Sequence, residues 1–137
     1  MSEREEHFQQ IVRKLGIGAY TRHVLLCTGP NCCTPEEGTR AWEALKRELK
    51  DQGVTDCYRT KVGCLRICAH GPTALVYPDG TWYHGMTAER VPQLVRQHLG
   101  EGRPLEDLAF ATNPFADSEQ NLAAADPTCS YPAKENP

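Results

Sequence analysis

The sequence lacks the features that would place it in several large protein classes. Its apolar runs are only a few residues long, too short for a membrane-spanning helix. Its first ten residues carry charged side chains from the third position and do not form the apolar stretch of a signal peptide. It also has no excess of basic residues, since 15 Lys and Arg stand against 18 Asp and Glu for a net charge of −3. That balance argues against a nucleic-acid partner. We therefore expect a cytoplasmic protein with neither a membrane nor a nucleic-acid partner.

Cysteine is the residue type that the sequence has in unusual number. Seven cysteines occur among 137 residues: Cys27, Cys32, Cys33, Cys57, Cys64, Cys68 and Cys129. None of them forms the Cys-x-x-Cys pattern that thiol–disulfide enzymes place at the start of a helix. In a reducing compartment, clustered cysteines more often bind metal than form structural disulfides. Metal binding is therefore the first hypothesis for this cluster.

The apolar periodicity divides the chain into three parts. A helical pattern over residues 3–15 ends at Gly16 and predicts an N-terminal helical extension, residues 1–20, packed against the main domain or against a partner. Residues 21–110 alternate strand and helix patterns and form the predicted domain. Residues 111–137 contain four prolines and few large apolar residues, so we expect a disordered tail there.

Within the domain, local signals predict an α/β fold with a mixed four-stranded sheet flanked by helices. Thr34 and Glu37 form a capping box at the start of one helix, and Thr87 is the expected cap of another that ends at Gly100. Pro78-Asp79-Gly80 predicts a hairpin turn. The predicted strands cover residues 23–27, 54–62, 73–77 and 81–84, and the helices residues 35–53 and 87–100. A strand–helix–strand unit followed by a hairpin gives the thioredoxin-like arrangement.

Four cysteines lie in two loops that this topology brings to one end of the sheet. Four residues separate Cys27 from Cys32, after the first strand, and three separate Cys64 from Cys68, before the third. Four thiolates are what a 2Fe–2S cluster needs, and the helix that begins after Cys32 directs its N-terminal N–H groups toward them. Two alternatives use the same residues. Tetrahedral zinc also takes four cysteines, although its pairs usually have two intervening residues, and free cysteines also serve as small buried side chains.

Three stretches resemble the thioredoxin-like 2Fe–2S ferredoxin family: HVLLCTGPNC, TKVGCLRICAHGPTALVYPDGTWYHGMTAERVPQLVRQHL and GRPLEDL. The ligand spacing is also similar to that of the thioredoxin-like subunit of respiratory complex I. The resemblance covers residues 22–108. It implies an electron carrier rather than an enzyme, which passes one electron to redox partner proteins and is often a homodimer. It also implies that Cys27, Cys32, Cys64 and Cys68 bind the 2Fe–2S cluster.

The sequence departs from the family in places, and two other functions stay open. Many stand-alone members have a longer gap between the first two cysteines, and Cys33 is an extra thiol beside Cys32. The open alternatives are a zinc-stabilised binding module and a cluster-bearing subunit of a larger redox complex. Pro72 occupies the place where thioredoxin-like folds often have a cis-proline, and His70 is expected to be a loop residue rather than a ligand. Three cations are candidates to offset a negative cluster: Arg59, Lys61 and Arg66.

Overall fold

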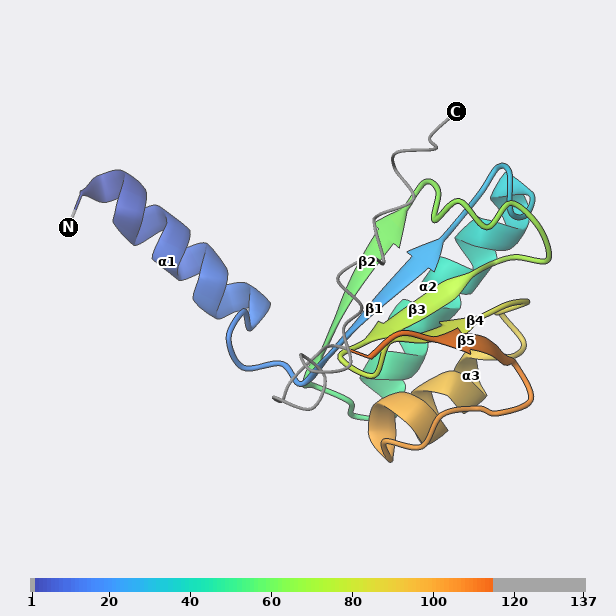
Figure 1. Ribbon diagram of the computed structural model, residues 1–137. Coiled ribbons are helices and arrows are strands. Elements are labelled where there is room, and N and C mark those ends of the chain that lie inside the picture. The colour runs from blue at the N-terminus through green and yellow to red at the C-terminus, as the bar shows by residue number, and fades with distance from the viewer. Residues whose placement is uncertain (1, 115–137) are drawn as a thin grey trace, which may run out of the picture.

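The computed structural model describes residues 2–114; residue 1 and residues 115–137 lie outside the described part. The expectation of a disordered tail therefore falls outside the described residues from position 115 onward. The described elements follow the order α1, β1, α2, β2, β3, β4, α3, η1 and β5 (Figure 1). No helix in residues 2–114 is both long enough and apolar enough to cross a membrane.

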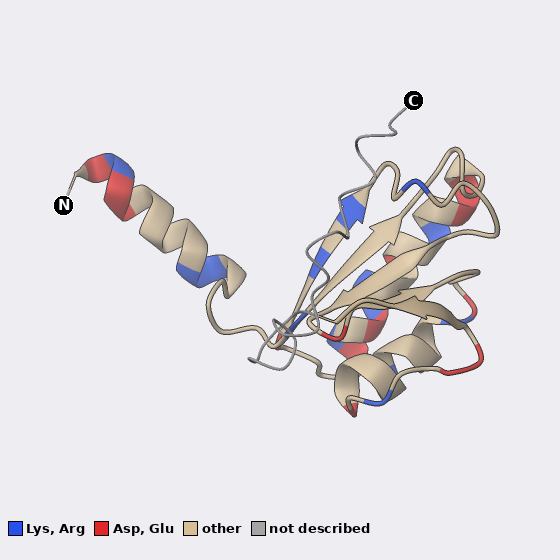
Figure 2. Ribbon diagram, viewed as in Figure 1, with Lys and Arg blue, Asp and Glu red and all other residues tan. Residues whose placement is uncertain are grey.

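The N-terminal helix α1 (Glu3–Leu15) forms as predicted but does not pack on the domain. Ser2 caps its start, and Gly16, in the left-handed conformation, ends it. The helix buries none of its residues and extends away from the sheet in Figure 1, with Phe8 58% exposed. Acidic residues lie in its first turn and basic residues in its last (Figure 2), which favours the helix dipole. The predicted helix is confirmed, whereas packing against the main domain is not what the structure shows.

The first unit of the domain is β1 (Arg22–Cys27), α2 (Pro35–Asp51) and β2 (Cys57–Val62), with the two strands parallel. The predicted capping box is present, because the Glu37 N–H donates to Thr34 Oγ1 at 3.1 Å and the Thr34 N–H donates to Glu37 Oε1 at 3.0 Å. Small residues let α2 approach closely, since a Cβ at Gly38 would lie only 2.1 Å from the Thr28 carbonyl oxygen. The close approach places the start of α2 against the loop that follows β1.

The sheet has five strands, and not the four that the sequence predicted. Strands β3 (Ala74–Tyr77) and β4 (Thr81–Tyr83) form the predicted hairpin, and β5 (Ala109–Thr112) pairs antiparallel with β4. The strand order is β2-β1-β3-β4-β5, so the mixed α/β arrangement is confirmed. The predicted domain boundary at residue 110 is wrong, because β5 runs across it and the Asn113 N–H donates to the Gly80 carbonyl at 2.7 Å. Four residues without alternation gave no local signal for this strand.

The last predicted helix begins later than expected, at Val91 instead of near Thr87, and it consists of two segments. It consists of α3 (Val91–Gln93) followed by the π-helical segment η1 (Leu94–Gly100). The side chain of Thr87 does not cap it; instead, the Thr87 carbonyl accepts the backbone N–H groups of Arg90 and Val91. The predicted Thr87 cap is therefore wrong, because a backbone turn takes its place.

Helices α2 and α3–η1 contact each other and cover the same face of the sheet (Figure 1). The core lies between these helices and that face. The opposite face presents Leu25, Leu75 and Trp82, which are direct neighbours across β1, β3 and β4. The buried core residues come from all these elements: Val24, Leu26, Ala41, Ala44, Leu45, Leu49, Ala74, Val76, Tyr83, Met86, Val91, Leu94, Val95, Leu99 and Leu105.

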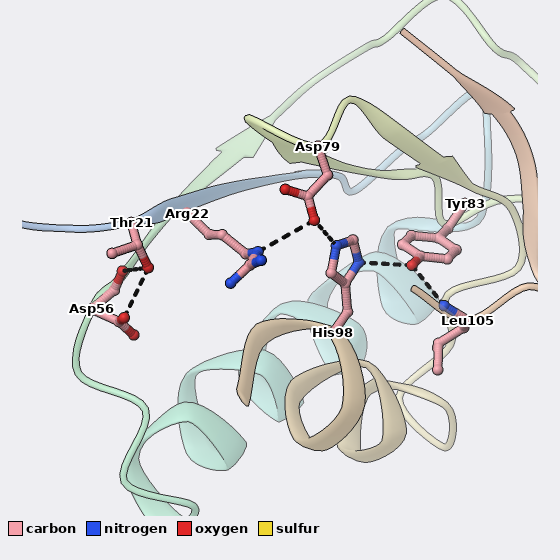
Figure 3. Close-up of polar contacts among 7 residues, drawn as sticks. All are labelled: Thr21, Arg22, Asp56, Asp79, Tyr83, His98 and Leu105. Atoms are coloured by element: carbon pink, nitrogen blue, oxygen red, sulfur yellow. Dashed lines mark hydrogen bonds and ion pairs between the residues drawn. The ribbon is translucent and has the colours of Figure 1, made fainter. Parts of the chain in front are cut away.

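A buried polar network closes the hairpin end of the sheet (Figure 3). The Leu105 N–H donates to Tyr83 Oη at 2.9 Å, and Tyr83 Oη lies 2.7 Å from His98 Nδ1. His98 Nε2 lies 2.5 Å from Asp79 Oδ2, which also accepts from Arg22 Nε at 3.3 Å. Since Tyr83 and His98 are fully buried, the network joins the hairpin turn, η1 and the segment before β5 inside the protein.

Candidate metal centre

The candidate metal centre lies where the two parallel strands end. Cys27 is the last residue of β1, and Cys64 follows the end of β2 by two residues. Because β1 and β2 are parallel, their carboxyl ends and the loops that follow them lie at one end of the sheet (Figure 1). The topology therefore brings both cysteine-bearing loops to the same end, as the sequence predicted.

Cys27 and Cys32 form the first thiol pair. Their Sγ atoms are 2.8 Å apart, and both side chains are buried, with 1% and 7% of their surface exposed. The loop before β3 packs directly on this pair, since the Gly71 N–H donates to the Cys32 carbonyl at 2.8 Å. A Cβ at Gly71 would lie 2.7 Å from the Cys32 Cβ, so only glycine fits this approach. Backbone contacts thus hold the two cysteine loops together.

Cys64 and Cys68 form a second, exposed pair. The Arg66 N–H donates to Cys64 Sγ at 3.2 Å, and Arg66 takes a positive φ of 70° that turns the loop between the two cysteines. Desolvation, followed by the neighbouring thiols of Cys64 and Cys27, raises the pKa of Cys68. Cys68 therefore lies within electrostatic reach of both Cys64 and Cys27.

The structure brings the four predicted ligands to one end of the sheet as two pairs, and not as one four-sulfur group. Cys27 Sγ lies 3.7 Å from the carbonyl oxygen of Gly63, the residue before Cys64, so the buried pair borders the second loop. In residues 2–114, no three His, Cys, Asp or Glu side chains are close enough together to hold a metal ion.

Burial favours the protonated form of the Cys32 thiol, because it raises the pKa of that group. Burial, followed by hydrogen bonds with Cys27 and Cys33, raises the pKa of Cys32 to about 12. Burial also raises the pKa of Cys33. Thiolates are the form that binds metal, so metal binding at Cys32 has to release a proton.

Two further cysteines in the described chain have different surroundings. Cys33 is half-buried, and its Sγ lies 3.8 Å from that of Cys32, whereas Cys32 lies 2.8 Å from Cys27. Cys57 packs against the core at the start of β2, and burial raises its pKa to about 11. Cys129 lies outside the described residues. Cys33 is thus the one extra thiol that the described chain places beside the buried pair.

Of the three cations expected to offset a negative cluster, Arg66 lies nearest to the cysteines. Its charge acts to lower the pKa of Cys68, against the desolvation and thiol neighbours that raise it. Arg59 and Lys61 instead lie over the ring of Trp42, 5.6 Å and 5.9 Å from its centroid. These two cations extend across the edge of the sheet toward α2 and pack there.

The loop before β3 has the backbone features that the sequence suggested. The Gly71–Pro72 peptide bond is cis, as expected, and the Gly29–Pro30 and Tyr77–Pro78 bonds are cis as well. His70 is exposed, and its carbonyl accepts the Gly85 N–H at 2.6 Å, which ties the loop to the end of β4.

Sequence reasoning missed one polar residue at this end, Thr73. Its carbonyl accepts the Cys27 N–H at 2.8 Å, its side chain is fully buried, and its hydroxyl has no hydrogen-bond partner among the described residues. The sequence signal that could have identified Thr73 is its position at the start of a predicted strand, one residue after Pro72 and opposite Cys27. The Asp79–His98–Tyr83 network was also missed, although His98 stands among apolar residues on the buried side of its helix.

Comparisons with known proteins give a consistent set of relatives. No family model matches the chain. A Priestia megaterium protein described as a 2Fe–2S ferredoxin is 31% identical over 85 residues, which are 62% of this chain and 66% of the relative. A 2Fe–2S ferredoxin of Aquifex aeolicus is 42% identical over 52 residues, 38% of this chain and 47% of the relative. One from Clostridium pasteurianum is 28% identical over 94 residues, 63% of this chain and 92% of the relative.

The solved structures agree with these relatives. The structure of a thioredoxin-like [2Fe-2S] ferredoxin from Aquifex aeolicus superposes with a TM-score of 0.62 and 28% sequence identity. The superposition covers 73% of this chain and 99% of that structure. The five-stranded mixed sheet, the two cysteine loops at one end of it and these relatives lead to the same conclusion: the chain belongs to the thioredoxin-like 2Fe–2S ferredoxin family.

Proposed function

We propose that this protein is a one-electron carrier, and not an enzyme, whose 2Fe–2S cluster is bound by Cys27, Cys32, Cys64 and Cys68. The observation that carries the proposal is the placement of two cysteine pairs at one end of a sheet shared with 2Fe–2S ferredoxins. The chain covers 66% and 47% of the lengths of the first two relatives. Because that coverage is partial, the proposed activity is argued from the cysteine site of this chain as well as from the relatives.

The residues present fit such a cluster in donor type and in charge. Four thiols are the donors that the two irons require. The N-cap of α2, Thr34, stands two residues after Cys32, and the positive end of the helix dipole there favours the negative charge of a thiolate-bound cluster. The unpaired Thr73 hydroxyl lies in the strand segment opposite Cys27. When bound, the cluster supplies reversible one-electron chemistry, while the chain holds it, limits its contact with water and sets its potential.

Within the proposed ligand set, Cys32 is chosen over Cys33. Cys32 Sγ lies 2.8 Å from Cys27 Sγ, whereas Cys33 Sγ contacts Cys32 Sγ, at 3.8 Å. Buried Cys27 and Cys32 would anchor the cluster, and exposed Cys64 and Cys68 would leave one side of it near the surface. A redox partner protein could then approach the cluster from the side of the second pair. We also propose that the protein forms a homodimer and resides in the cytoplasm, where its free cysteines stay reduced.

The test is the metal content of protein purified without air from cells supplied with iron and sulfur. We expect two irons and two sulfides per chain, a red-brown colour, and a paramagnetic signal after reduction by one electron. Colourless protein that contains equimolar zinc and no iron would contradict the proposal and support a zinc-stabilised binding module.

A second candidate, a cluster-bearing subunit of a larger redox complex, is favoured by the exposed apolar side chains of α1. Phe8, Ile11 and Leu15 are all exposed on a helix that buries no residue in the described chain. A permanent partner subunit would cover such a helix. Co-purification with a larger protein, together with loss of solubility in its absence, would favour this candidate over a free carrier.

A further inference from the structure

The side chain of Thr73 is the feature of the cysteine end that the fold itself does not explain. It is fully buried, yet its hydroxyl is the one buried side-chain N or O atom in residues 2–114 without a hydrogen-bond partner. Buried polar groups in native proteins are nearly always paired, and an unpaired one calls for a specific cause such as a ligand. A hydroxyl in the interior that contributes no hydrogen bond destabilises the protein relative to an apolar group of the same shape.

The strand register places this hydroxyl beside the proposed cluster. In the antiparallel pair of β1 and β3, Leu26 lies opposite Ala74, so the next pair along the strands is Cys27 and Thr73. The Cys27 N–H donates to the Thr73 carbonyl at 2.8 Å, which shows that the pairing continues to this position. Directly opposed residues in antiparallel strands have their side chains on the same face of the sheet. Thr73 and Cys27 are therefore neighbours on one face.

The other residues around Thr73 also belong to the cysteine end. Gly71, two residues before it, contacts Cys32 through its backbone, and Pro72 connects that contact to Thr73. The segment from Gly71 to Thr73 is thus fixed against both cysteines of the buried pair. This fixed position keeps the hydroxyl at the site without a hydrogen bond of its own to hold it there.

We propose that the Thr73 hydroxyl donates a hydrogen bond to a sulfur of the bound 2Fe–2S cluster and raises its reduction potential. The inference rests on the proposed function. One-electron reduction adds one negative charge to the cluster and its ligands, and this charge spreads onto the sulfurs. A donated hydrogen bond is stronger to the more negative state, so it stabilises the reduced cluster more than the oxidised one. Thr73 acts here as a positioning and tuning residue, and it is not a ligand.

The test compares Thr73→Val, which has nearly the same shape but no hydroxyl, with Thr73→Ser, which keeps the hydroxyl. In cluster-loaded protein, Thr73→Val should lower the reduction potential, with a shift of about tenfold in the equilibrium between reduced and oxidised cluster, or about 59 mV for one electron. Thr73→Ser should stay close to the wild-type value. Spectroelectrochemical titration of the visible absorption measures all three potentials.

The cluster-free protein provides a second, independent measurement. Because the hydroxyl has no hydrogen-bond partner among residues 2–114, Thr73→Val should leave the free energy of unfolding of the apo protein unchanged or should raise it. Thr60→Val is the matched control, since Thr60 Oγ1 lies 2.7 Å from His23 Nε2 and therefore has a partner. That control should destabilise the apo protein and leave the reduction potential unchanged.

Several outcomes would overturn the inference. An unchanged potential in Thr73→Val would show that the hydroxyl does not reach the cluster. A loss of apo stability in Thr73→Val would show that the hydroxyl has a partner within the chain. If Thr73→Val does not load a cluster, loading restored in Thr73→Ser supports the inference, and loading absent in both variants overturns it. Wild-type protein without iron and sulfide would instead show that the proposed function itself has failed.

Discussion

The two ends of the sheet differ in how far their buried polar groups are hydrogen-bonded. At the hairpin end, Tyr83, His98 and Asp79 are joined in one continuous chain of hydrogen bonds (Figure 3). At the cysteine end, the buried thiol of Cys32 contacts other thiols and the Cys27 carbonyl, and the Thr73 hydroxyl has no partner in the described residues. The polar groups of the hairpin end are thus paired with one another, whereas the cysteine end, where we propose that the cluster binds, leaves a buried hydroxyl unpaired among the described residues.

Hydrogen-bond directions at the hairpin end follow from the partners. Tyr83 Oη accepts the Leu105 N–H, so its own O–H is available to donate to His98 Nδ1. The proton of the neutral imidazole then lies on Nε2 and is donated to the Asp79 carboxylate, which also accepts from Arg22. Burial raises the pKa of Tyr83 to about 12 and lowers the pKa of His98, and both shifts favour these neutral forms.

The largest effect is expected from removing thiols at the cysteine end. The double substitution Cys32→Ser with Cys33→Ser should abolish most cluster binding, because serine oxygen is a harder ligand than thiolate and the described residues place no further spare thiol beside this position. Cys32→Ser alone should reduce cluster yield or shift the spectrum, with Cys33 close enough to substitute at 3.8 Å. Iron content and visible absorption per chain measure both.

The matched control is Cys33→Ser alone, which should keep the wild-type spectrum. If Cys33→Ser abolishes the cluster while Cys32→Ser does not, the proposed ligand at this position is wrong. None of these substitutions should change the hairpin-end network, so the unfolding free energy of the apo proteins should stay close to that of the wild type.

At the hairpin end, Tyr83→Phe should destabilise the protein without changing its cluster content. The change leaves the buried Leu105 N–H and His98 Nδ1 without a partner, which costs about 1–3 kcal/mol for each unpaired buried group. Urea unfolding of the apo protein measures the loss. Tyr58→Phe is the control, since Tyr58 is half-buried and stacks on Tyr20 through its ring. Equal stabilities of Tyr83→Phe and wild type would show that the network contributes little.

A smaller effect is expected from His98 of the same network, which should make the protein less stable in mild acid. Burial lowers the pKa of His98 below its ordinary value of 6.5, so the unfolded chain binds a proton in a pH range where the folded chain does not. The stability therefore falls as the pH drops from 6.5 toward the folded value, by at most about 1.4 kcal/mol per pH unit for this group. Burial lowers the pKa of His23 too, so its contribution has the same sign.

Urea unfolding at a series of pH values from 7.5 to about 4.5 measures this dependence, and His98→Gln isolates one histidine. That variant should be less stable at neutral pH but should show a shallower decline with acid. Asp79 affects the pH dependence of stability only at lower pH, because its pKa lies below the ordinary value. Burial acts to raise that pKa, but the His98 hydrogen bond and the Arg22 charge outweigh burial and lower it. An identical slope in His98→Gln and wild type would contradict the assignment.

The smallest effect is expected from removing α1, which belongs to neither end. Deletion of residues 1–17 should change the free energy of unfolding by no more than about 0.5 kcal/mol, because the helix buries no residue. Cluster content should also stay the same. A large loss of stability in the isolated protein would show that α1 packs on the domain or on a second copy, and a loss seen only with a partner present would favour the subunit candidate.

Elements with strong local signals were predictable. The capping box of Thr34 and Glu37 and the Pro78-Asp79-Gly80 turn depend on interactions between residues a few positions apart, and both formed as predicted. Strand β5 was missed, because its pairing with β4 comes from a segment distant in sequence. The Thr87 cap was predicted from a local pattern that a backbone turn replaced.

For the metal centre, the sequence by itself determined the residue types and spacing: two cysteine pairs, each in a loop next to a strand, with a helix start beside the first. Only the tertiary structure decided that one pair is buried and the other exposed, that Cys32 contacts Cys27, and that Thr73 is left unpaired beside them. The physical reason is that spacing along the chain fixes which groups can meet, whereas burial and pairing depend on strand register and on the loops that pack over it.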